Sequence, residues 1–461
     1  MKVNSRLLRL GGCLWCALAA MTAAAEGGVD DLFVPEQIIV ELVPGNDVAE
    51  INADYGTSVL ESIDLLNLYL LKLPDGADED EFEALLGDDE RIEDVELNFH
   101  SEAAEGQTES FYLRVDPESY SSQYTPDTIG LDPAHEISRG AGIRVALLDT
   151  GADTGHEILV GHIVPESYNL IDKTADVSDI GNDLDDDGDG LVDEMVGHGT
   201  FMAGLAAMTA PEADLLILKV LDSDGIGNSF QIASGIYYAV EHGADVINLS
   251  LALGTKRQIL KDAISYAYDA GIVVVAAAGN LGQDEPVRYP AAHPDVIGVA
   301  STDAEDCKSD FSNFGTHISL CAPGSDIVST IPDNEYALWQ GTSMATALVS
   351  GAAALLKSAE PGSTPDEVSD VLRDTAWDLD PKNPGYHGLL GAGRLDVAAA
   401  LGVGGLAGDV NGDGIVNIDD VFAVLDEWGD CPSPPADCPA DLDSSDVVDI
   451  NDLFAVLANW H

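Results

Sequence analysis

Buried-type strands alternate with amphipathic stretches through the middle of the chain. Five runs rich in Val, Ile and Leu predict strands: IRVALLD (143–149), ADLLILKVL (213–221), ADVINLSL (244–251), GIVVVAAAGN (271–280) and DVIGVAS (295–301). Between them, HGTFMAGLAAM (198–208), SFQIASGIYYAVEHG (229–243) and KRQILKDAISYAYDAG (256–271) predict helices. Continuous apolar strands alternating with helices indicate an α/β fold, a mostly parallel, doubly wound sheet with helices on both faces. In such sheets, functional sites gather at the carboxyl ends of the strands.

The sequence before this region has a different pattern. EQIIVELV (36–43) and LYLLKL (68–73) predict strands, and DEDEFEALLGD (78–88) predicts a helix, which together indicate a small α+β unit. At the other end, the Gly-rich passage LGVGGLAG leads into an acidic tail with an internal repeat. We therefore divide the chain into residues 1–25, 26–115, 116–403 and 404–461.

The first 25 residues have the pattern of a secretory signal peptide. Lys2, Arg6 and Arg9 precede the short apolar run LGGCLWCALAA, and Ala23–Ala25 supplies small residues for cleavage. An alternative is a lipoprotein cleavage box ending at Cys13. The run is too short to cross a membrane, so we expect a secreted protein without a membrane span.

Charge narrows the choice of partners. The chain of 461 residues has 19 basic and 83 acidic residues, a formal net charge of −64. Nucleic acid and anionic membrane surfaces are poor partners for such a chain. The acidity either keeps the protein soluble, as in a saline habitat, or binds cations.

Cysteine spacing suggests local cross-links. Cys13 and Cys16 leave with the signal peptide, and Cys307 with Cys321 and Cys431 with Cys438 form two close pairs. In an exported protein we expect both pairs to be disulfides. Buried free thiols are the alternative.

Four polar residues stand where strands end and helices begin. Asp149 ends a predicted strand, Asn280 ends another, and His198 and Ser343 each open an apolar helix. A serine hydroxyl needs a base such as imidazole to take its proton, and a carboxylate to orient that base. The Asn280 amide and the Ser343 backbone N–H would then stabilise an oxyanion. Singly, each residue could be a turn or helix cap, but together they indicate a nucleophilic site.

Four motifs around these residues resemble the subtilisin-like serine proteases, or subtilases: VALLDTG, GHGTFMAG, AAAGN and GTSMATALVSG. The order Asp, His, Ser is that of this family and differs from that of α/β-hydrolases. The resemblance implies an endopeptidase that acts on proteins or peptides through an acyl-enzyme. It also implies a substrate-binding strand at Ser250, Leu251, Ala252, Leu253 and Gly254. Ala252 and Leu253 replace glycines there, so the preference for the residue before the cut bond stays open.

The same resemblance explains the N-terminal unit. Residues 35–100 look like a subtilase propeptide of the inhibitor type, which assists folding, fills the cleft and is cut off between about 100 and 120. A permanent structural domain is the alternative.

Three acidic segments have the spacing of calcium loops. In the tail, the first copy has Asp409, Asn411, Asp413, Asn417 and Asp420 at ligand positions, with the Ile415 carbonyl. The second copy has Asp441, Asp443, Ser445, Asp449 and Asp452, with the Val447 carbonyl. Upstream of His198, a third loop offers Asp185, Asp187, Asp189 and Asp193, with the Leu191 carbonyl. We expect Ca²⁺ in all three; a disordered tail and a solvated loop are the alternatives.

The two tail loops lead into matching helices, VFAVLDEW and LFAVLANW, and together resemble a dockerin module, a small EF-hand-like α module. The resemblance implies attachment to a cohesin-like or surface scaffold. We therefore expect a secreted, calcium-stabilised protease made as a precursor. A catalytically silent binding scaffold and a processing protease of narrow specificity are the rival hypotheses.

Overall fold

The computed structural model describes residues 33–107, 112–403, 410–411, 416–431, 438, 440, 442 and 447–458. The predicted signal peptide lies outside the described residues. No helix in these ranges is long and apolar enough to cross a membrane.

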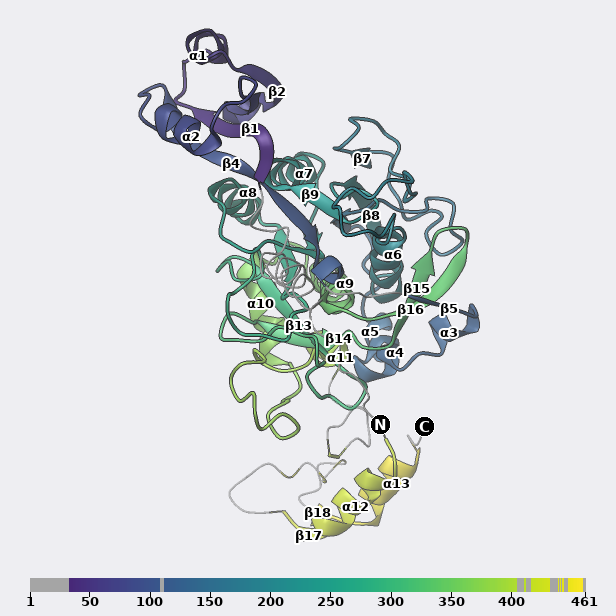
Figure 1. The fold of residues 1–461 in the computed structure, drawn as a ribbon. Helices are drawn as coiled ribbons and strands as arrows, with labels where there is room; N and C mark the ends of the chain where they lie inside the picture. Colours follow the sequence, from purple (N-terminus) through teal and green to yellow (C-terminus); the bar gives the residue numbers. More distant parts are fainter. Residues whose placement is uncertain are drawn as a thin grey trace, which may run out of the picture.

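A seven-stranded sheet forms the centre of the molecule (Figure 1). Its strand order is β14 (Leu320–Pro323), β13 (Ile297–Thr302), β12 (Val273–Ala277), β10 (Val246–Leu249), β6 (Arg144–Asp149), β8 (Asp214–Lys219) and β7 (Tyr168–Asn169). Every neighbouring pair is parallel. The five predicted runs form β6, β8, β10, β12 and β13, so the predicted parallel sheet is confirmed. Later strands add to both sides of β6, which makes the carboxyl end of β6 the switch point where sites form.

Four helices cover this sheet as two packed pairs, α6 (His198–Thr209) with α9 (Thr342–Ala359) and α7 (Ser229–Glu241) with α8 (Gln258–Asp269). Consecutive residues of β10 and β12 are buried, which requires cover on both faces. The pair α6 and α9 crosses closely because a Cβ on Gly351 would lie 2.4 Å from Thr209 Cβ. This contact fixes the two helices whose first residues are His198 and Thr342.

The N-terminal unit is an antiparallel sheet with its own apolar core. Its strands are β1 (Phe33–Leu42), β2 (Ser58–Ile63), β3 (Leu68–Lys72) and β4 (Ile92–Ala103), accompanied by α1 (Val48–Tyr55), η2 (Asp64–Leu66) and α2 (Glu79–Gly87). The core includes Ile38, Val40 and Leu71, which are fully buried.

Strand β4 joins the two units. Its first part pairs with β1, and its last residues pair antiparallel with β9 (Ile226–Asn228) and β11 (Leu251–Ala252) of the central unit. Figure 1 shows β4 running from the N-terminal unit down to the start of α9. After β4 the chain forms the short helix η3 (Ala104–Gln107).

Smaller elements complete the central unit. A three-stranded sheet has the order β15 (Ile327–Ile331), β16 (Glu335–Trp339) and β5 (Leu113–Val115). The remaining helices are α3 (Glu118–Ser121), α4 (Thr125–Thr128), α5 (Leu131–His135), α10 (Pro365–Asp374) and α11 (Val397–Ala400).

The described part of the tail contains two helices, α12 (Ile418–Asp426) and α13 (Ile450–Ala458), with the strand pair β17 (Gly429–Asp430) and β18 (Val447–Val448). Val424 and Val456 are buried in a small apolar cluster between the helices. A disulfide joins Cys431 to Cys438.

The other predicted disulfide is wrong for this structure, since Cys307 and Cys321 are free. Cys321 is a buried residue of β14, and its thiol donates to the Leu390 carbonyl at 3.3 Å. Cys307 lies partly exposed in the turn after β13. Separation along the chain does not bring two Cβ atoms within disulfide reach when one belongs to the core of a sheet.

Candidate active site

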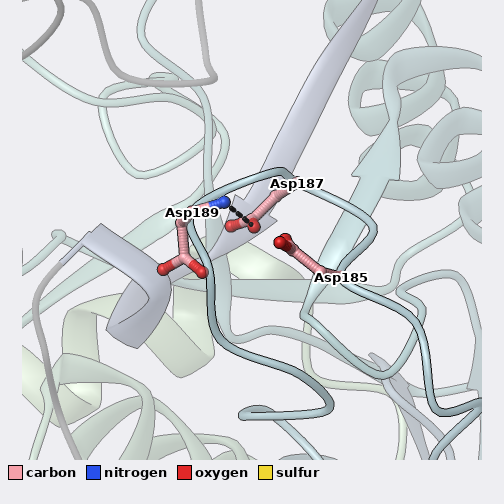
Figure 2. Close-up of side chains that lie close together, drawn as sticks. All are labelled: Asp185, Asp187 and Asp189. Atoms are coloured by element: carbon pink, nitrogen blue, oxygen red, sulfur yellow. Dashed lines mark hydrogen bonds between the residues drawn. The ribbon is translucent and has the colours of Figure 1, made fainter.

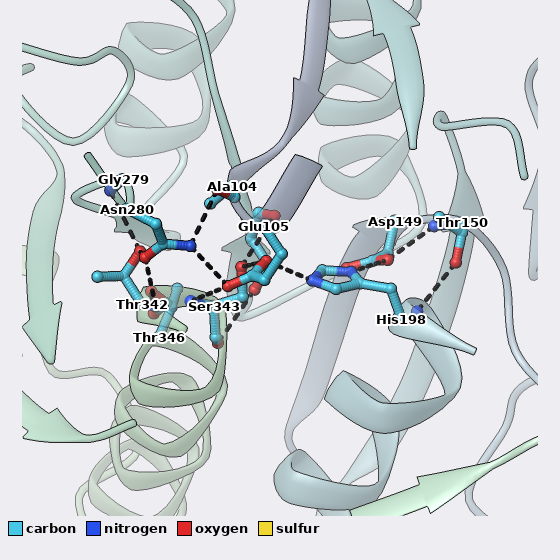
Figure 3. Close-up of polar contacts among 12 residues, drawn as sticks. Ala104, Glu105, Asp149, Thr150, His198, Gly279, Asn280, Thr342, Ser343 and Thr346 are labelled. Atoms are coloured by element: carbon cyan, nitrogen blue, oxygen red, sulfur yellow. Dashed lines mark hydrogen bonds and ion pairs between the residues drawn. The ribbon is translucent and has the colours of Figure 1, made fainter. Parts of the chain in front are cut away.

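Asp149, His198 and Ser343 meet at the carboxyl end of β6 (Figure 3). Asp149 is the last residue of β6, and its Oδ1 lies 2.7 Å from His198 Nδ1. The same oxygen accepts the Thr150 backbone N–H at 2.8 Å. All three predicted residues are fully buried.

The first turn of α6 holds His198 in place. Thr150 Oγ1 accepts the Gly199 N–H at 2.9 Å, which ties this turn to the end of β6. Glycine is required at 199 because a Cβ there would lie 2.1 Å from the Gly151 carbonyl oxygen. The Trp339 ring meets the imidazole edge to face, with centroids 5.6 Å apart. The imidazole therefore has a fixed orientation toward Asp149.

Ser343 stands in the first turn of α9, where free backbone N–H groups and the helix dipole favour negative charge. Asn280 follows β12 and turns its amide toward this helix end. Its Oδ1 accepts both the backbone N–H and the hydroxyl of Thr342, each at 2.9 Å. The Nδ2 group is thereby directed into the space beside Ser343.

A fifth residue, Glu105 of η3, occupies the middle of this site. Its Oε2 accepts the Ser343 hydroxyl at 2.5 Å and lies 2.7 Å from His198 Nε2. Its Oε1 accepts the Asn280 Nδ2 group at 3.0 Å and the Ser343 backbone N–H at 3.3 Å. Three of the four sequence-predicted residues, His198, Ser343 and Asn280, thus converge on one carboxylate, and Asp149 contacts His198 from the other side. The sequence offered no signal that Glu105 would be there.

Two carboxylates on either side of the imidazole dominate its electrostatics. Burial alone would lower the His198 pKa, but Asp149 and Glu105 outweigh it and raise that pKa well above its usual value. Burial would raise the pKa of Glu105, but its contacts with His198, Ser343 and Asn280 leave that pKa below the usual value. The contacts with Asp149 and Glu105 therefore favour the protonated form of His198.

The predicted substrate-binding strand lies beside this site. Leu251 and Ala252 form β11, and Leu253 continues it through a backbone bridge with Tyr289. Ser250, Leu251, Ala252 and Leu253 are fully buried, whereas Gly254 is partly exposed. The partner of β11 is β4, so a peptide already lies along this strand.

Three of the predicted calcium ligands upstream of His198 lie together (Figure 2). Carboxylate oxygens of Asp185, Asp187 and Asp189 come within 4.8 Å of one another. Asp193 is not part of this cluster. Its two oxygens accept the backbone N–H groups of Asn182 at 2.7 Å and Asp183 at 3.1 Å. The Leu191 N–H donates to Asp189 Oδ1 at 2.6 Å.

The acidic loop is fastened to the strand that borders the cleft. Asp224, one residue before Gly225, accepts the N–H groups of Asp186 and Asp193, each at 2.5 Å. Gly225 in turn accepts the Ala103 N–H at 2.8 Å. The loop precedes His198 in the chain, and these contacts also tie it to the segment that leads into β9.

In the tail, the residues at the last position of both predicted loops behave alike. Asp420 accepts backbone N–H groups of Val410 and Asn417, each at 2.8 Å, and Asp452 accepts those of Leu442 and Asp449, each at 2.7 Å. Both are fully buried. Asn411 and Val447 are also described; Asp409, Asp413, Ile415, Asp441, Asp443 and Ser445 lie outside the described residues.

Comparisons with known proteins agree with this geometry. A family model described as the subtilase family matches residues 140–393, and one described as the fervidolysin N-terminal prodomain matches residues 19–98. The chain is 39% identical to thermitase of Thermoactinomyces vulgaris over 275 residues, which is 58% of this chain and 92% of that protein. It is 36% identical to subtilisin DY of Bacillus licheniformis over 300 residues, 60% of this chain and 99% of the relative.

The fold is also similar to that of solved structures. Fervidolysin from Fervidobacterium pennivorans, described as a keratinolytic enzyme related to subtilisin, aligns with a TM-score of 0.68 at 24% identity. The alignment covers 81% of this chain and 62% of that one. A protease of Pseudoalteromonas arctica aligns with a TM-score of 0.56 at 29% identity, covering 63% of this chain and 99% of the other.

Proposed function

This chain belongs to the subtilase family and is a serine endopeptidase, and from that premise we propose that Asp149, His198, Ser343 and Asn280 are its catalytic groups. The observation that carries this assignment is the convergence of His198, Ser343 and Asn280 on the Glu105 carboxylate, with Asp149 on the far side of the imidazole. The two Glu105 oxygens stand in for the oxygens of a tetrahedral intermediate, one facing the base and nucleophile and one facing two N–H donors.

With a peptide carbonyl in that place, neutral His198 takes the Ser343 proton while Oγ attacks the carbonyl carbon. Asp149 keeps the imidazole oriented through Nδ1 and stabilises the imidazolium that forms. Asn280 Nδ2 and the Ser343 N–H hold the oxyanion. His198 then gives the proton to the leaving amine, and water releases the acyl group by the same route in reverse.

A serine-directed fluorophosphonate probe tests this assignment. The mature protein is labelled and the adduct mapped by mass spectrometry. Ser343→Ala, which cannot cut itself and is converted in trans by the wild-type enzyme, is the variant, and Ser350→Ala of the same helix is the matched control. We expect the label on Ser343 in the wild type and in Ser350→Ala, and none in Ser343→Ala. Peptidase activity that survives Ser343→Ala contradicts the mechanism.

We also propose that the enzyme is a secreted precursor, with residues 1–25 as signal peptide, 26–115 as propeptide, 116–403 as peptidase domain and 404–461 as tail. Support comes from the prodomain match and from β4 lying in the cleft between β9 and β11. The protein substrates of the mature enzyme would occupy the same place.

We propose Ca²⁺ as a structural ion of the loop before His198. The donor set fits a hard cation, since Asp185, Asp187 and Asp189 offer several carboxylate oxygens close together. Asp193 is outside this donor set, because its carboxylate does not lie with the other three. Bound Ca²⁺ would relieve the repulsion among three carboxylates and so order the loop tied to Asp224.

For the tail, we propose a dockerin-like module that binds Ca²⁺ and attaches the enzyme to a cohesin-like or surface scaffold. The helices α12 and α13 expose matching apolar residues, which is unusual for helices with no partner: Ile418, Phe422 and Leu425 on one, and Ile450, Phe454 and Leu457 on the other. A protein lacking residues 404–461 that localises like the full chain contradicts this role.

A further inference from the structure

The end of β4 lies in the cleft as the middle strand between β9 and β11. Ser101 faces Gly227 on one side, and Ala103 faces Leu251 on the other. Ala103 donates its N–H to the Gly225 carbonyl at 2.8 Å, and Ala104 donates to the Ser250 carbonyl at 3.4 Å. Addition of an extended segment between two strands is a common way to bind a peptide.

The Ala104 carbonyl is the one that the oxyanion donor contacts. Asn280 Nδ2 donates to the Ala104 oxygen at 2.9 Å, and the Ser343 hydroxyl lies at the same helix end. Because an oxyanion donor marks the carbonyl on which negative charge will develop, the peptide bond in position for attack is Ala104–Glu105.

Glu105, the residue after this bond, blocks attack on it. η3 turns the chain back after β4, and the Glu105 side chain lies over Ser343, His198 and Asn280 (Figure 3). The Asn280 amide is shared between the Ala104 oxygen and Glu105 Oε1. Gly341 leaves the space for this carboxylate, since a Cβ there would lie 1.8 Å from Glu105 Oε1.

We propose that Ala104–Glu105 is the bond that the enzyme cuts in its own precursor, and that the Glu105 carboxylate is a latch that delays the cut. This inference rests on the proposed function. In the cut, Ser343 Oγ bonds to the Ala104 carbonyl carbon, the bond to the Glu105 nitrogen breaks, and that nitrogen receives the serine proton through His198. Water then frees the Ala104 carboxylate, leaving Glu105 as the new N-terminus. The propeptide would thus end at residue 104, before the boundary at 115 drawn from the sequence pattern.

The Glu105 carboxylate affects the protonation of His198 as well as filling the space beside Ser343. Asp149 and Glu105 are the ionisable side chains hydrogen-bonded to the imidazole, and between them they favour its protonated form. Farther out, Asp179 accepts the Gly197 N–H at 3.1 Å, and Lys219 donates to the Thr150 carbonyl. An imidazolium cannot take the Ser343 proton, so attack waits until Glu105 leaves.

Conversion of the purified precursor to the mature chain tests both the position of the cut and the role of Glu105 as a latch. The wild type, Glu105→Gln and Glu105→Ala are followed over time, with the exposed prodomain residue Glu90 changed to Gln as matched control. We expect the mature chain to begin at residue 105 in every case. Both Glu105 variants should convert faster than wild type by tenfold or more, because a base freed for proton transfer is worth about 10²-fold or more. Glu90→Gln should convert at the wild-type rate.

A first cut at another bond overturns the assignment of the bond. Conversion of Glu105→Gln and Glu105→Ala at the wild-type rate overturns the latch. Faster conversion of Glu90→Gln as well would also overturn it, since the effect would then be a general loosening of the prodomain.

A second measurement needs no change at Glu105. The Ser343→Ala precursor cannot cut itself, so its His198 can be titrated by NMR and compared with the mature wild-type enzyme. We expect a higher His198 pKa in the precursor, and a fall toward the mature value in Ser343→Ala/Glu105→Gln. Equal His198 titration in the Ser343→Ala precursor and in the mature enzyme overturns the latch.

The two measurements also separate this inference from the proposed function. If Ser343 is not a nucleophile, no variant converts and the fluorophosphonate probe labels none of them. The titration of His198 in the Ser343→Ala precursor reports its contact with Glu105 whether or not Ser343 is the nucleophile.

Discussion

At the residue scale, the direction of the Asn280 amide depends on Thr342. The Thr342 hydroxyl donates to Asn280 Oδ1 at 2.9 Å and accepts the Gly279 N–H at 3.2 Å. Since the amide oxygen is held on this side, the Nδ2 donor can only point toward the oxyanion position. Thr342 is therefore a positioning residue next to the nucleophile.

Thr342→Val should lower kcat by about tenfold with little change in KM, because the backbone N–H of residue 342 still holds Asn280 and only part of the oxyanion stabilisation is lost. Steady-state kinetics on a peptide substrate measure both constants. Thr342→Ser should restore kcat. Thr346→Val is the matched control, since that hydroxyl donates to the Thr342 carbonyl instead; an equal loss there contradicts the positioning role.

The proximity of Asp149, His198, Asn280 and Ser343 could be predicted because each stands next to a strand end or helix start that the sequence marks. Glu105 could not, since its position depends on the register of β4 against β11, which no local pattern encodes. Asp193 was assigned to the acidic cluster from spacing alone. Its carboxylate lies instead against the backbone N–H groups of Asn182 and Asp183, a placement that the spacing does not encode.

At the scale of elements, β4 supplies side-chain acceptors at the starts of two helices, α8, which has no cap of its own, and α7, which also has Asn228. Glu96 accepts the N–H groups of Gln258 at 3.0 Å and Ile259 at 2.8 Å at the start of α8, where Arg257 makes no side-chain cap. Asn98 accepts the Phe230 N–H at 3.2 Å at the start of α7. The strand that blocks the cleft thus also completes the helix pair beneath it.

Glu96 makes this junction sensitive to pH. Burial raises its pKa from 4.5 to about 7, against the lowering effect of the two N–H donors. A raised carboxyl pKa means that the folded precursor favours the protonated form. The associated stability is fully present below pH 4.5 and is lost as pH rises through about 7.

The Ser343→Ala precursor should therefore lose about 3 kcal/mol of stability between pH 4.5 and 8 from this group, by linkage. Glu96→Gln should remove most of that dependence, because an amide does not titrate, although its single oxygen can replace only one of the two carboxylate acceptors. Denaturant unfolding at a series of pH values measures it. A Glu96→Gln precursor whose stability changes with pH as steeply as before contradicts the assignment.

The elements themselves were largely predictable, because buried parallel strands have a continuous apolar pattern. β4 and β2 were missed. Much of β4, including Glu96 and Asn98, carries polar residues that face the central unit, so its pattern is not that of an ordinary buried strand. Cys321 was assigned to a disulfide by spacing, whereas the sheet buries it and raises its thiol pKa to about 12.

At the scale of the whole molecule, the chain has a net charge of −64, and some of its acidic residues lie at the junction between the N-terminal unit and the central unit. A cavity of about 240 Å³ between the N-terminal unit and α8 is lined by acidic groups of both, among them Glu41, Asp94 and Asp262. Burial and mutual repulsion raise the pKa of Glu41 and of Asp94. Like charges across this junction favour separation of the two units once the chain is cut.

Calcium should matter for the peptidase as a whole. Removal of Ca²⁺ with a chelator should lower the Tm of the mature enzyme by roughly 5–10 °C, since an ion present at 100 times its Kd contributes about 2.7 kcal/mol. Asp185→Asn/Asp189→Asn should have a low Tm with or without Ca²⁺. Asp176→Asn, an exposed residue outside the cluster, should respond like the wild type. Calorimetry measures the difference, and a double variant that still responds to Ca²⁺ contradicts the site.

The continuity of β4 from the N-terminal unit into the cleft makes activation depend on dilution. While the chain is intact, the inhibiting strand is tethered and its effective concentration is fixed by geometry, however few molecules are present. After one cut, the same strand must rebind as a separate molecule. The rate of rebinding is proportional to the concentration of the released prodomain, so it falls on dilution. A precursor at high concentration at its site of synthesis would stay inhibited after the cut. The cut enzyme would become active only when the protein is diluted and the prodomain no longer rebinds.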